Sequence, residues 1–157
     1  MQPHARQVWA LAGFIGLCFL AAALGGRATA SSVGTWYRTL TKPAWNPPGW
    51  VFGPVWTLLY AMMAVAAWLV WRQVGWGGAL AVFGVQLALN VVWSFCFFGR
   101  RSPLAGLVDI VLLWAAIALT LVWFWRVNRL AGLLFVPYLW WVTFAAALNF
   151  SIWRLNP

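Results

Sequence analysis

Five long apolar runs, separated by short polar stretches, make up most of this sequence. They cover about residues 8–24, 48–71, 77–98, 104–125 and 130–153. An apolar helix of roughly 20 residues crosses the hydrocarbon core of a bilayer, whereas the strands of a membrane barrel are alternating segments of about ten residues. These runs are continuous and rich in Leu and Ala. The sequence therefore predicts an all-α membrane protein, a bundle of five transmembrane helices that forms a single domain over residues 1–157.

The composition agrees with a chain embedded in lipid. Of its 157 residues, 65% are hydrophobic and one is acidic, which leaves too little polar surface for a soluble domain. The formal charge of +9 raises the alternative of nucleic-acid binding, but the basic residues lie outside or at the ends of the apolar runs. Membrane proteins place headgroup and topology anchors there. We expect the lipid bilayer, and no nucleic acid, as the partner of these charges.

The basic residues also predict an orientation. The amino tail and the second and fourth connections carry four of the ten, and the opposite side carries the other six, including Lys42 and Arg154. By the positive-inside tendency, the long first loop and the carboxyl end face the cytoplasm. We expect a multi-pass protein of a bacterial membrane, inner or outer undecided, with an organellar membrane as the alternative.

The first apolar run has two interpretations. Arg6 precedes it and Ala28-Thr29-Ala30 follows it, a pattern that also fits a signal peptide with a small-residue cleavage site. The run is longer than an ordinary signal sequence, and Arg27 stands directly before the supposed site, so we interpret it as the first membrane helix. Residues 25–47 are then a polar loop outside the hydrocarbon, and a new helix starts at the proline pair that follows.

Asp109, the only acidic residue, lies about one turn into the fourth helix. An ionised group is costly there unless it is paired or hydrated. We expect Asp109 to face the bundle interior and to pair with Arg100, Arg101 or polar groups of the third helix. Its role is structural or, as the alternative, concerned with ligand or proton handling.

Polar and aromatic stripes predict a cavity inside the bundle. Gln86, Asn90 and Ser94 recur every four residues and so share one face of the third helix. Because lipid cannot satisfy them, they face inward, as interhelical hydrogen bonds or as the polar wall of a cavity. Inward stripes on the second and fifth helices contain Trp56, Tyr60, Met63, Tyr138, Trp141, Ala145 and Asn149. An aromatic cavity with a few polar anchors is typical of a small-molecule site.

The sequence offers little for acid–base or metal chemistry. It has one histidine, His4, and two separate cysteines inside apolar runs, Cys18 and Cys96. We therefore expect no metal site, no haem held by a buried histidine and no obligatory cofactor. A flat ligand would stack on aromatic faces, with basic residues at its acidic groups.

Several motifs resemble the TspO and translocator protein family. They are WYRTLTKPAWNPP at residues 36–48, FGPVWTLLY at 52–60, QLALN at 86–90, LVD at 107–109, PYLWW at 137–141 and ALNF at 147–150. They stand in the family's order and cover nearly the whole chain. The resemblance implies a five-helix bundle, commonly a homodimer, whose cavity under the first loop, residues 25–47, binds tetrapyrroles such as protoporphyrin IX. In animal members it also binds cholesterol and benzodiazepine-type compounds.

The stripes and the resemblance together predict eleven ligand-binding residues. These are Trp36, Trp45, Trp56, Tyr60, Asn90, Trp93, Asp109, Tyr138, Trp141, Ala145 and Asn149. Trp56 and Trp141 match tryptophans implicated in light-dependent porphyrin breakdown by some bacterial members, and Ala145 matches the position of a ligand-affecting variant. Tyr138 has no Lys or Arg within the five residues that follow it, so the family's sterol motif is incomplete, and porphyrin ranks ahead of cholesterol.

The expected function is a receptor or sensor that binds protoporphyrin IX or a haem-like tetrapyrrole and regulates porphyrin levels or a stress response. One alternative is a transporter of porphyrin or sterol-like ligands, motivated by Asp109. Another is photochemical porphyrin degradation, an enzymatic activity carried by Trp56 and Trp141. Small residues on the third helix, Gly77 with Ala81 and Gly84 with Ala88, further predict a homodimer through that helix.

Overall fold

The computed structural model describes residues 3–157, which form helices and their connections, with no strand among them. The elements are α1 (Pro3–Ala30), α2 (Trp36–Thr39), α3 (Gly49–Val74), α4 (Gly78–Ser94), the π-helix η1 (Phe95–Gly99), α5 (Pro103–Val127) and α6 (Arg129–Leu155). With η1 continuing α4, five helices in the described part are long and apolar enough to cross a membrane. The predicted all-α bundle of five transmembrane helices is confirmed.

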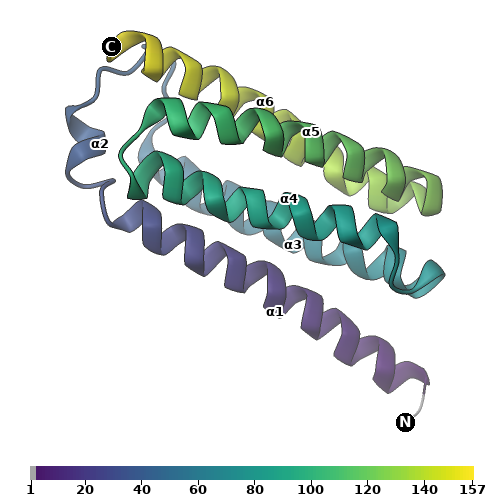
Figure 1. Ribbon diagram of the computed structural model, residues 1–157. Coiled ribbons are helices and arrows are strands. Elements are labelled where there is room, and N and C mark those ends of the chain that lie inside the picture. The colour runs from purple at the N-terminus through teal and green to yellow at the C-terminus, as the bar shows by residue number, and fades with distance from the viewer. Residues whose placement is uncertain (1–2) are drawn as a thin grey trace.

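The long helices run side by side as one bundle (Figure 1). The helix α5 packs against α4 and α6, α3 packs against α6, and α1 packs against α3 and α4. One end of the bundle carries α2, the α4–α5 turn and the carboxyl end of the chain, and the other carries the amino end and the two remaining turns. Consecutive long helices are thus antiparallel, as short connections require.

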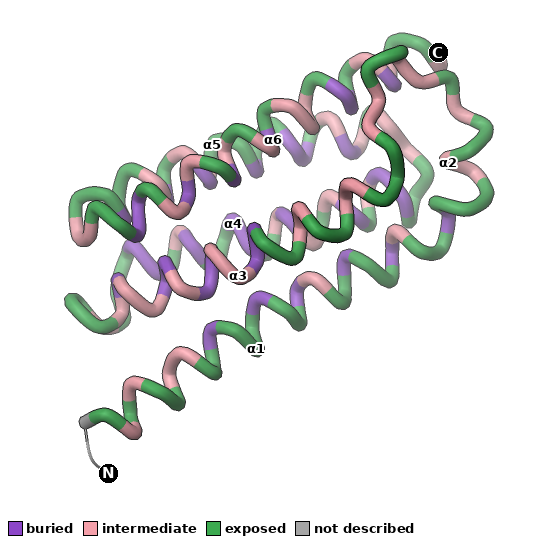
Figure 2. The backbone as a smooth tube through the Cα atoms, turned by 180° about the vertical axis from the view of Figure 1, so that it is seen from behind, coloured by how far each residue is buried: buried purple, intermediate pink, exposed green. Residues whose placement is uncertain are grey.

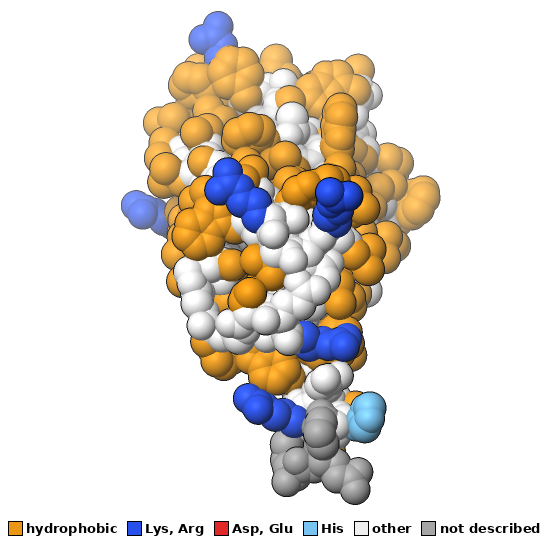
Figure 3. All heavy atoms as spheres, turned by 90° about the vertical axis from the view of Figure 1, so that its right-hand side faces the viewer, with side chains coloured by type: hydrophobic (Ala, Val, Ile, Leu, Met, Phe, Trp, Pro, Cys, Tyr) orange, Lys and Arg blue, Asp and Glu red, His pale blue; other side chains and the backbone are white. Residues whose placement is uncertain are grey.

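Buried residues lie mostly on the inward sides of the helices, and exposed ones face outward (Figure 2). Many exposed side chains are large and apolar along the whole length of the helices, which suits contact with lipid tails. At the end seen in Figure 3, basic side chains stand among hydrophobic ones. This arrangement is that of an integral membrane protein with charged ends.

Short polar signals set the helix ends. Before α5, the Ser102 side chain accepts a hydrogen bond from the amide of Ala105 at 3.1 Å, and Pro103 occupies the first helical position. Asn128 ends α5 and caps α6, because its side chain accepts from the amide of Ala131 at 3.0 Å. Such caps satisfy amides that have no partner inside the helix.

The first helix is longer than predicted. It continues past residue 24 to Ala30, and Thr29 Oγ1 donates to the carbonyl of Gly25 at 3.0 Å within it. Ala28 is buried. The small residues that also fitted a cleavage site are thus part of a packed helix, and the connection to α3 covers residues 31–48 rather than starting at residue 25.

Two glycines let α5 and α6 approach closely. A Cβ on Gly132 would lie 2.8 Å from the Cα of Trp125, and a Cβ on Gly106 would lie 2.9 Å from Asn149 Oδ1. Side chains at either position would push the two helices apart. The small residues at the start of α4 and along it behave differently, since Gly77, Ala81, Gly84 and Ala88 are exposed. The homodimer through this face stays a prediction.

Candidate ligand-binding site

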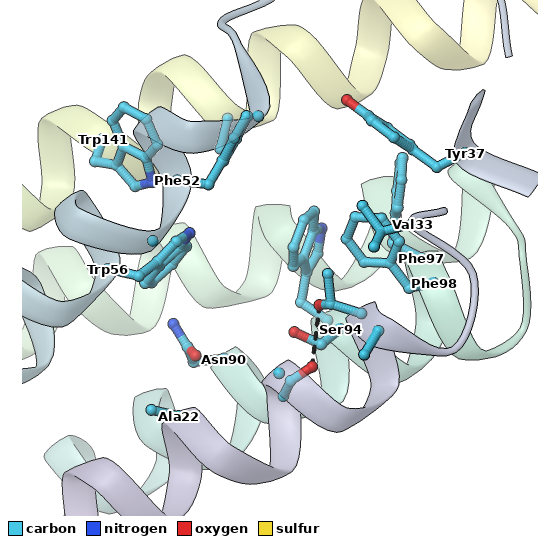
Figure 4. Close-up of a pocket in the computed structure, with 18 of the residues that line it drawn as sticks. Ala22, Val33, Tyr37, Phe52, Trp56, Asn90, Ser94, Phe97, Phe98 and Trp141 are labelled. Carbon is cyan, nitrogen blue, oxygen red and sulfur yellow. Dashed lines mark hydrogen bonds between the residues drawn. The ribbon is translucent and has the colours of Figure 1, made fainter. Parts of the chain in front are cut away.

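A cavity of about 540 Å³ lies inside the bundle, under the connection of residues 31–48. Its walls come from α1, α3, α4, η1 and α6. Figure 4 shows Phe52, Trp56 and Trp141 on one side of the cavity and Tyr37 and Phe97 on the other. The volume falls within the roughly 300–1,000 Å³ of small-molecule pockets, so the cavity can hold an organic ligand.

Aromatic rings from four helices and the roof line much of the cavity. The rings of Trp141 and Phe52 meet edge to face with centroids 5.8 Å apart, and Trp93 stacks on Phe97 at 5.3 Å. Trp56 packs on Tyr60 at 5.7 Å. Each contact fixes one ring against another, and all six residues line the cavity. Flat ring faces of this kind favour a flat, polarisable ligand.

A chain of hydrogen bonds leads from the cavity into the core. Tyr60 Oη donates to Asn90 Oδ1 at 2.5 Å, and Asn90 Nδ2 donates to Tyr138 Oη at 2.8 Å. Tyr138 Oη in turn donates to Gln86 Oε1 at 2.9 Å. The four side chains join α3, α4 and α6, and all are buried. The inward-facing polar stripe of α4 thus supplies both interhelical bonds and, through Asn90 and Ser94, part of the cavity wall.

A second polar cluster stands where α5 begins. Trp93 Nε1 donates to Asn149 Oδ1 at 3.1 Å, and Asn149 Nδ2 donates to the carbonyl of Pro103 at 2.7 Å. By contrast, Trp141 Nε1 is buried and has no hydrogen-bond partner among the described residues. An unpaired buried donor costs about 1–3 kcal/mol.

The connection of residues 31–48 forms the roof of the cavity and is tied down at several points. Ser32 Oγ donates to the carbonyl of Phe98 at 2.7 Å. Asn156, at the end of α6, both accepts from the amide of Thr41 and donates to its carbonyl, each at 2.9 Å. Tyr37 lines the cavity and donates to Asn46 Oδ1 at 3.2 Å. Burial raises the pKa of Tyr37, so its hydroxyl keeps the proton that it donates.

Comparison with known proteins agrees with this architecture. Residues 14–154 match the TspO/MBR family. The chain belongs to the TspO/MBR family. It is 49% identical over 156 residues to the tryptophan-rich protein TspO of Chlorobaculum tepidum, covering 97% of this chain and 99% of that protein.

Other TspO/MBR relatives carry different names. The tryptophan-rich sensory protein of Cereibacter sphaeroides is 44% identical to this chain, and the match covers 89% of this chain and 90% of that protein. The human translocator protein is also 44% identical, and that match covers 77% of this chain and 75% of the human protein. The resemblance read from the motifs is therefore confirmed.

The structure brings together seven of the eleven residues predicted for the TspO/MBR ligand site. The seven that line the cavity are Trp56, Tyr60, Asn90, Trp93, Trp141, Ala145 and Asn149. Tyr138 lies behind the wall and bonds to Asn90. Trp36 and Trp45 lie outside the cavity lining, where Trp36 packs on Phe97 and Trp45 on Phe144. Their roles in binding stay predictions.

Asp109 is buried as predicted, with 6% of its surface exposed, but it does not line the cavity. Within residues 3–157 it forms no ion pair with Arg100 or Arg101, and its Oδ2 has no hydrogen-bond partner. The predicted pairing with these arginines is therefore absent. The basic pair belongs to the turn after η1, and Arg101 takes a backbone φ of 53° in that turn.

Several aromatic residues of the cavity were missed by the sequence analysis. Phe52 lies one turn before Trp56 on α3, so its helical spacing could have revealed it. Phe97 and Phe98 belong to η1, where wider turns break the spacing of an α-helix. Tyr37 comes from the roof. No periodic pattern in the sequence could have placed these last three.

Proposed function

We propose that this member of the TspO/MBR family is a membrane receptor or sensor that binds a tetrapyrrole, such as protoporphyrin IX, in its aromatic cavity. The observation that carries this proposal is the cavity of about 540 Å³ with Trp56, Trp93 and Trp141 in its walls. A tetrapyrrole is flat and aromatic, and stacking on indole faces stabilises such a molecule without ionic contacts.

The surroundings of the cavity suit the rest of such a ligand. The roof end of the bundle carries Arg38, Lys42 and Arg100, so acidic groups at the edge of a tetrapyrrole would meet positive charge there. Lys42 Nζ also lies 4.8 Å from the centre of the Tyr37 ring.

Two alternative functions would use the same cavity. Light-dependent breakdown of the bound porphyrin is supported by Trp56 and Trp141, both of which line the cavity. Transport is supported by the name translocator protein, which belongs to a human relative. Asp109, which motivated the transport alternative, lies apart from the cavity lining. We therefore favour binding and sensing.

The test is a titration of the full chain in lipid bilayers with protoporphyrin IX. Tryptophan fluorescence is followed in the dark, and porphyrin absorbance is then followed under light. Saturable quenching with stable absorbance is expected for a receptor. Loss of absorbance that needs both light and Trp141 would favour degradation, and quenching absent altogether would refute tetrapyrrole binding.

Matched variants locate the site in the same titration. Trp56→Ala and Trp141→Ala should each weaken binding, because each removes an aromatic wall of the cavity. Trp140→Ala is the control, since Trp140 is adjacent in sequence, 74% exposed and absent from the cavity lining. Equal affinities in all three variants would place the ligand elsewhere.

A further inference from the structure

Gln86 lies deep in the bundle, next to the cavity but outside its lining. It is fully buried, and its Nε2 lies 3.7 Å from the sulfur of Met63. A thioether sulfur can accept a hydrogen bond but cannot donate one. The Gln86 amide is therefore oriented with its nitrogen toward Met63 and its oxygen toward Tyr138, which lies 2.9 Å away.

This orientation decides the direction of every later hydrogen bond in the chain. The Tyr138 hydroxyl has one proton, and it donates that proton to Gln86 Oε1. Its oxygen can then only accept from Asn90, so the Asn90 amide must turn its nitrogen toward Tyr138. Asn90 Oδ1 is left to accept from Tyr60. Each step follows from the one before it.

At the cavity, this chain of hydrogen bonds fixes the orientation of the Asn90 amide. Asn90 Nδ2 has a second N–H, which has no acceptor among the described residues, and Asn90 lines the cavity. Figure 4 shows its nitrogen on the side of Trp56. If the chain ran the other way, Asn90 would turn its oxygen to the position where its nitrogen now lies, and the Tyr60 hydroxyl would be left with a proton to donate. The orientation of the buried Gln86 amide determines which of these two directions the hydrogen-bond chain takes.

We propose that Gln86 is a positioning residue that fixes the Asn90 amide as a hydrogen-bond donor to the cavity, so that the bound ligand places an acceptor atom there. This inference rests on the proposed function for the identity of its probe. The chemical class of ligand is a flat aromatic molecule with an acceptor, such as an imine-type nitrogen or a carbonyl, directed at Asn90.

The binding test compares two substitutions of Gln86 in the full chain in bilayers, titrated with protoporphyrin IX. Gln86→Leu removes the acceptor, which frees the Tyr138 hydroxyl to reverse the chain. It should weaken binding by about three- to tenfold, the effect of one hydrogen bond. Gln86→Glu keeps an acceptor oxygen for Tyr138 whether the carboxyl is neutral or ionised, so it should bind within about twofold of the unsubstituted chain, a difference smaller than one hydrogen bond.

A second background separates positioning from a merely structural effect. Asn90→Leu should itself weaken binding, and adding Gln86→Leu to it should cause no further loss, because Gln86 acts through Asn90. Thr120→Val is the matched control. Thr120 is also fully buried and polar, but it bonds only within α5, to the carbonyl of Ala116. This variant should change thermal stability without changing affinity.

A measurement without ligand keeps this inference independent of the proposed function. The side-chain amide of Asn90 is followed by ¹⁵N NMR and assigned from the signals that vanish in Asn90→Leu. These signals should shift in Gln86→Leu and stay in place in Gln86→Glu. Unshifted signals in Gln86→Leu, or a loss of affinity that persists in the Asn90→Leu background, would overturn the inference. Failure of the unsubstituted chain to bind protoporphyrin would overturn only the proposed function.

Discussion

Arg101 has a backbone conformation that most residues avoid. Its φ of 53° lies in the left-handed region, at the turn between η1 and α5. A side chain with a Cβ costs about 1 kcal/mol there, whereas glycine adopts this conformation freely. Glycine also adds freedom to the unfolded chain, so we expect Arg101→Gly to raise the free energy of unfolding by part of that amount. The check is thermal unfolding in detergent, with Arg100→Gly as the control.

The control position, Arg100, differs from Arg101 in its backbone conformation. Arg100 is the neighbouring exposed arginine, but its φ is −85°. Glycine brings no relief there and adds freedom to the unfolded chain. Arg100→Gly should therefore leave stability unchanged or lower it. A rise of equal size in both variants would show that charge, rather than backbone strain, sets the effect.

Asp109 is a buried acid without an ionic partner in the described structure. Replacing one member of a buried ion pair strands the other charge, but here there is no pair to break. An amide also avoids the cost of burying a carboxylate in the membrane. Asp109→Asn should therefore unfold at the same temperature as the unsubstituted chain or a higher one.

Asn149→Leu gives the contrasting case. Asn149 is also buried but bonds to both Trp93 and the carbonyl of Pro103. Its loss leaves two partners unsatisfied and should destabilise the bundle by about 1–3 kcal/mol. If Asp109→Asn is as damaging as Asn149→Leu, then Asp109 has a partner that the described contacts do not include.

At the scale of elements, apolar length and polar breaks were enough to predict the five helices and their order. The breaks that predicted helix ends correctly were Pro-rich or capped, as at Ser102 and Pro103. The end of α1 was predicted too early because Gly25 and Gly26 look like loop residues. In the bundle they remain helical, and both line the cavity. Close packing, which a one-dimensional pattern does not contain, decides such positions.

The contact between α5 and α6 depends on Gly132. A Cβ there would lie 2.8 Å from the backbone of Trp125, which cannot move away as a flexible side chain could. Gly132→Ala should cost about 1–3 kcal/mol of unfolding free energy. Gly13→Ala on α1 is the control, because nothing lies within 4 Å of its Cβ position. Equal stabilities of the two variants would contradict this account of the contact.

For the whole molecule, the walls of the cavity were more predictable than its roof. The walls follow helical periodicity, so Trp56, Asn90 and Trp141 could be assigned to inward faces. The roof is held by contacts between distant parts of the chain, such as the pair formed by Thr41 and Asn156. Contacts of this kind depend on the assembled bundle, and no local pattern specifies them.

The pair between Thr41 and Asn156 gives a prediction for the roof. Asn156→Ala removes both hydrogen bonds to the Thr41 backbone, so the roof should open more often. Hydrogen–deuterium exchange of the segment 31–48 should speed up, most of all at the Thr41 amide. Ser151→Ala is the control, since Ser151 bonds only within α6. Unchanged exchange in Asn156→Ala would show that other contacts hold the roof.

The helix α5 stands apart from the cavity, because none of its described residues lines it, although it packs along α4 and α6. Its outward side chains, such as Leu112 with 56% exposed, are therefore suitable sites for a spectroscopic label. A fluorophore or spin probe attached there would report on movements of the neighbouring helices while leaving the binding surface chemically untouched. A label on α5 would therefore detect ligand binding without altering the cavity lining.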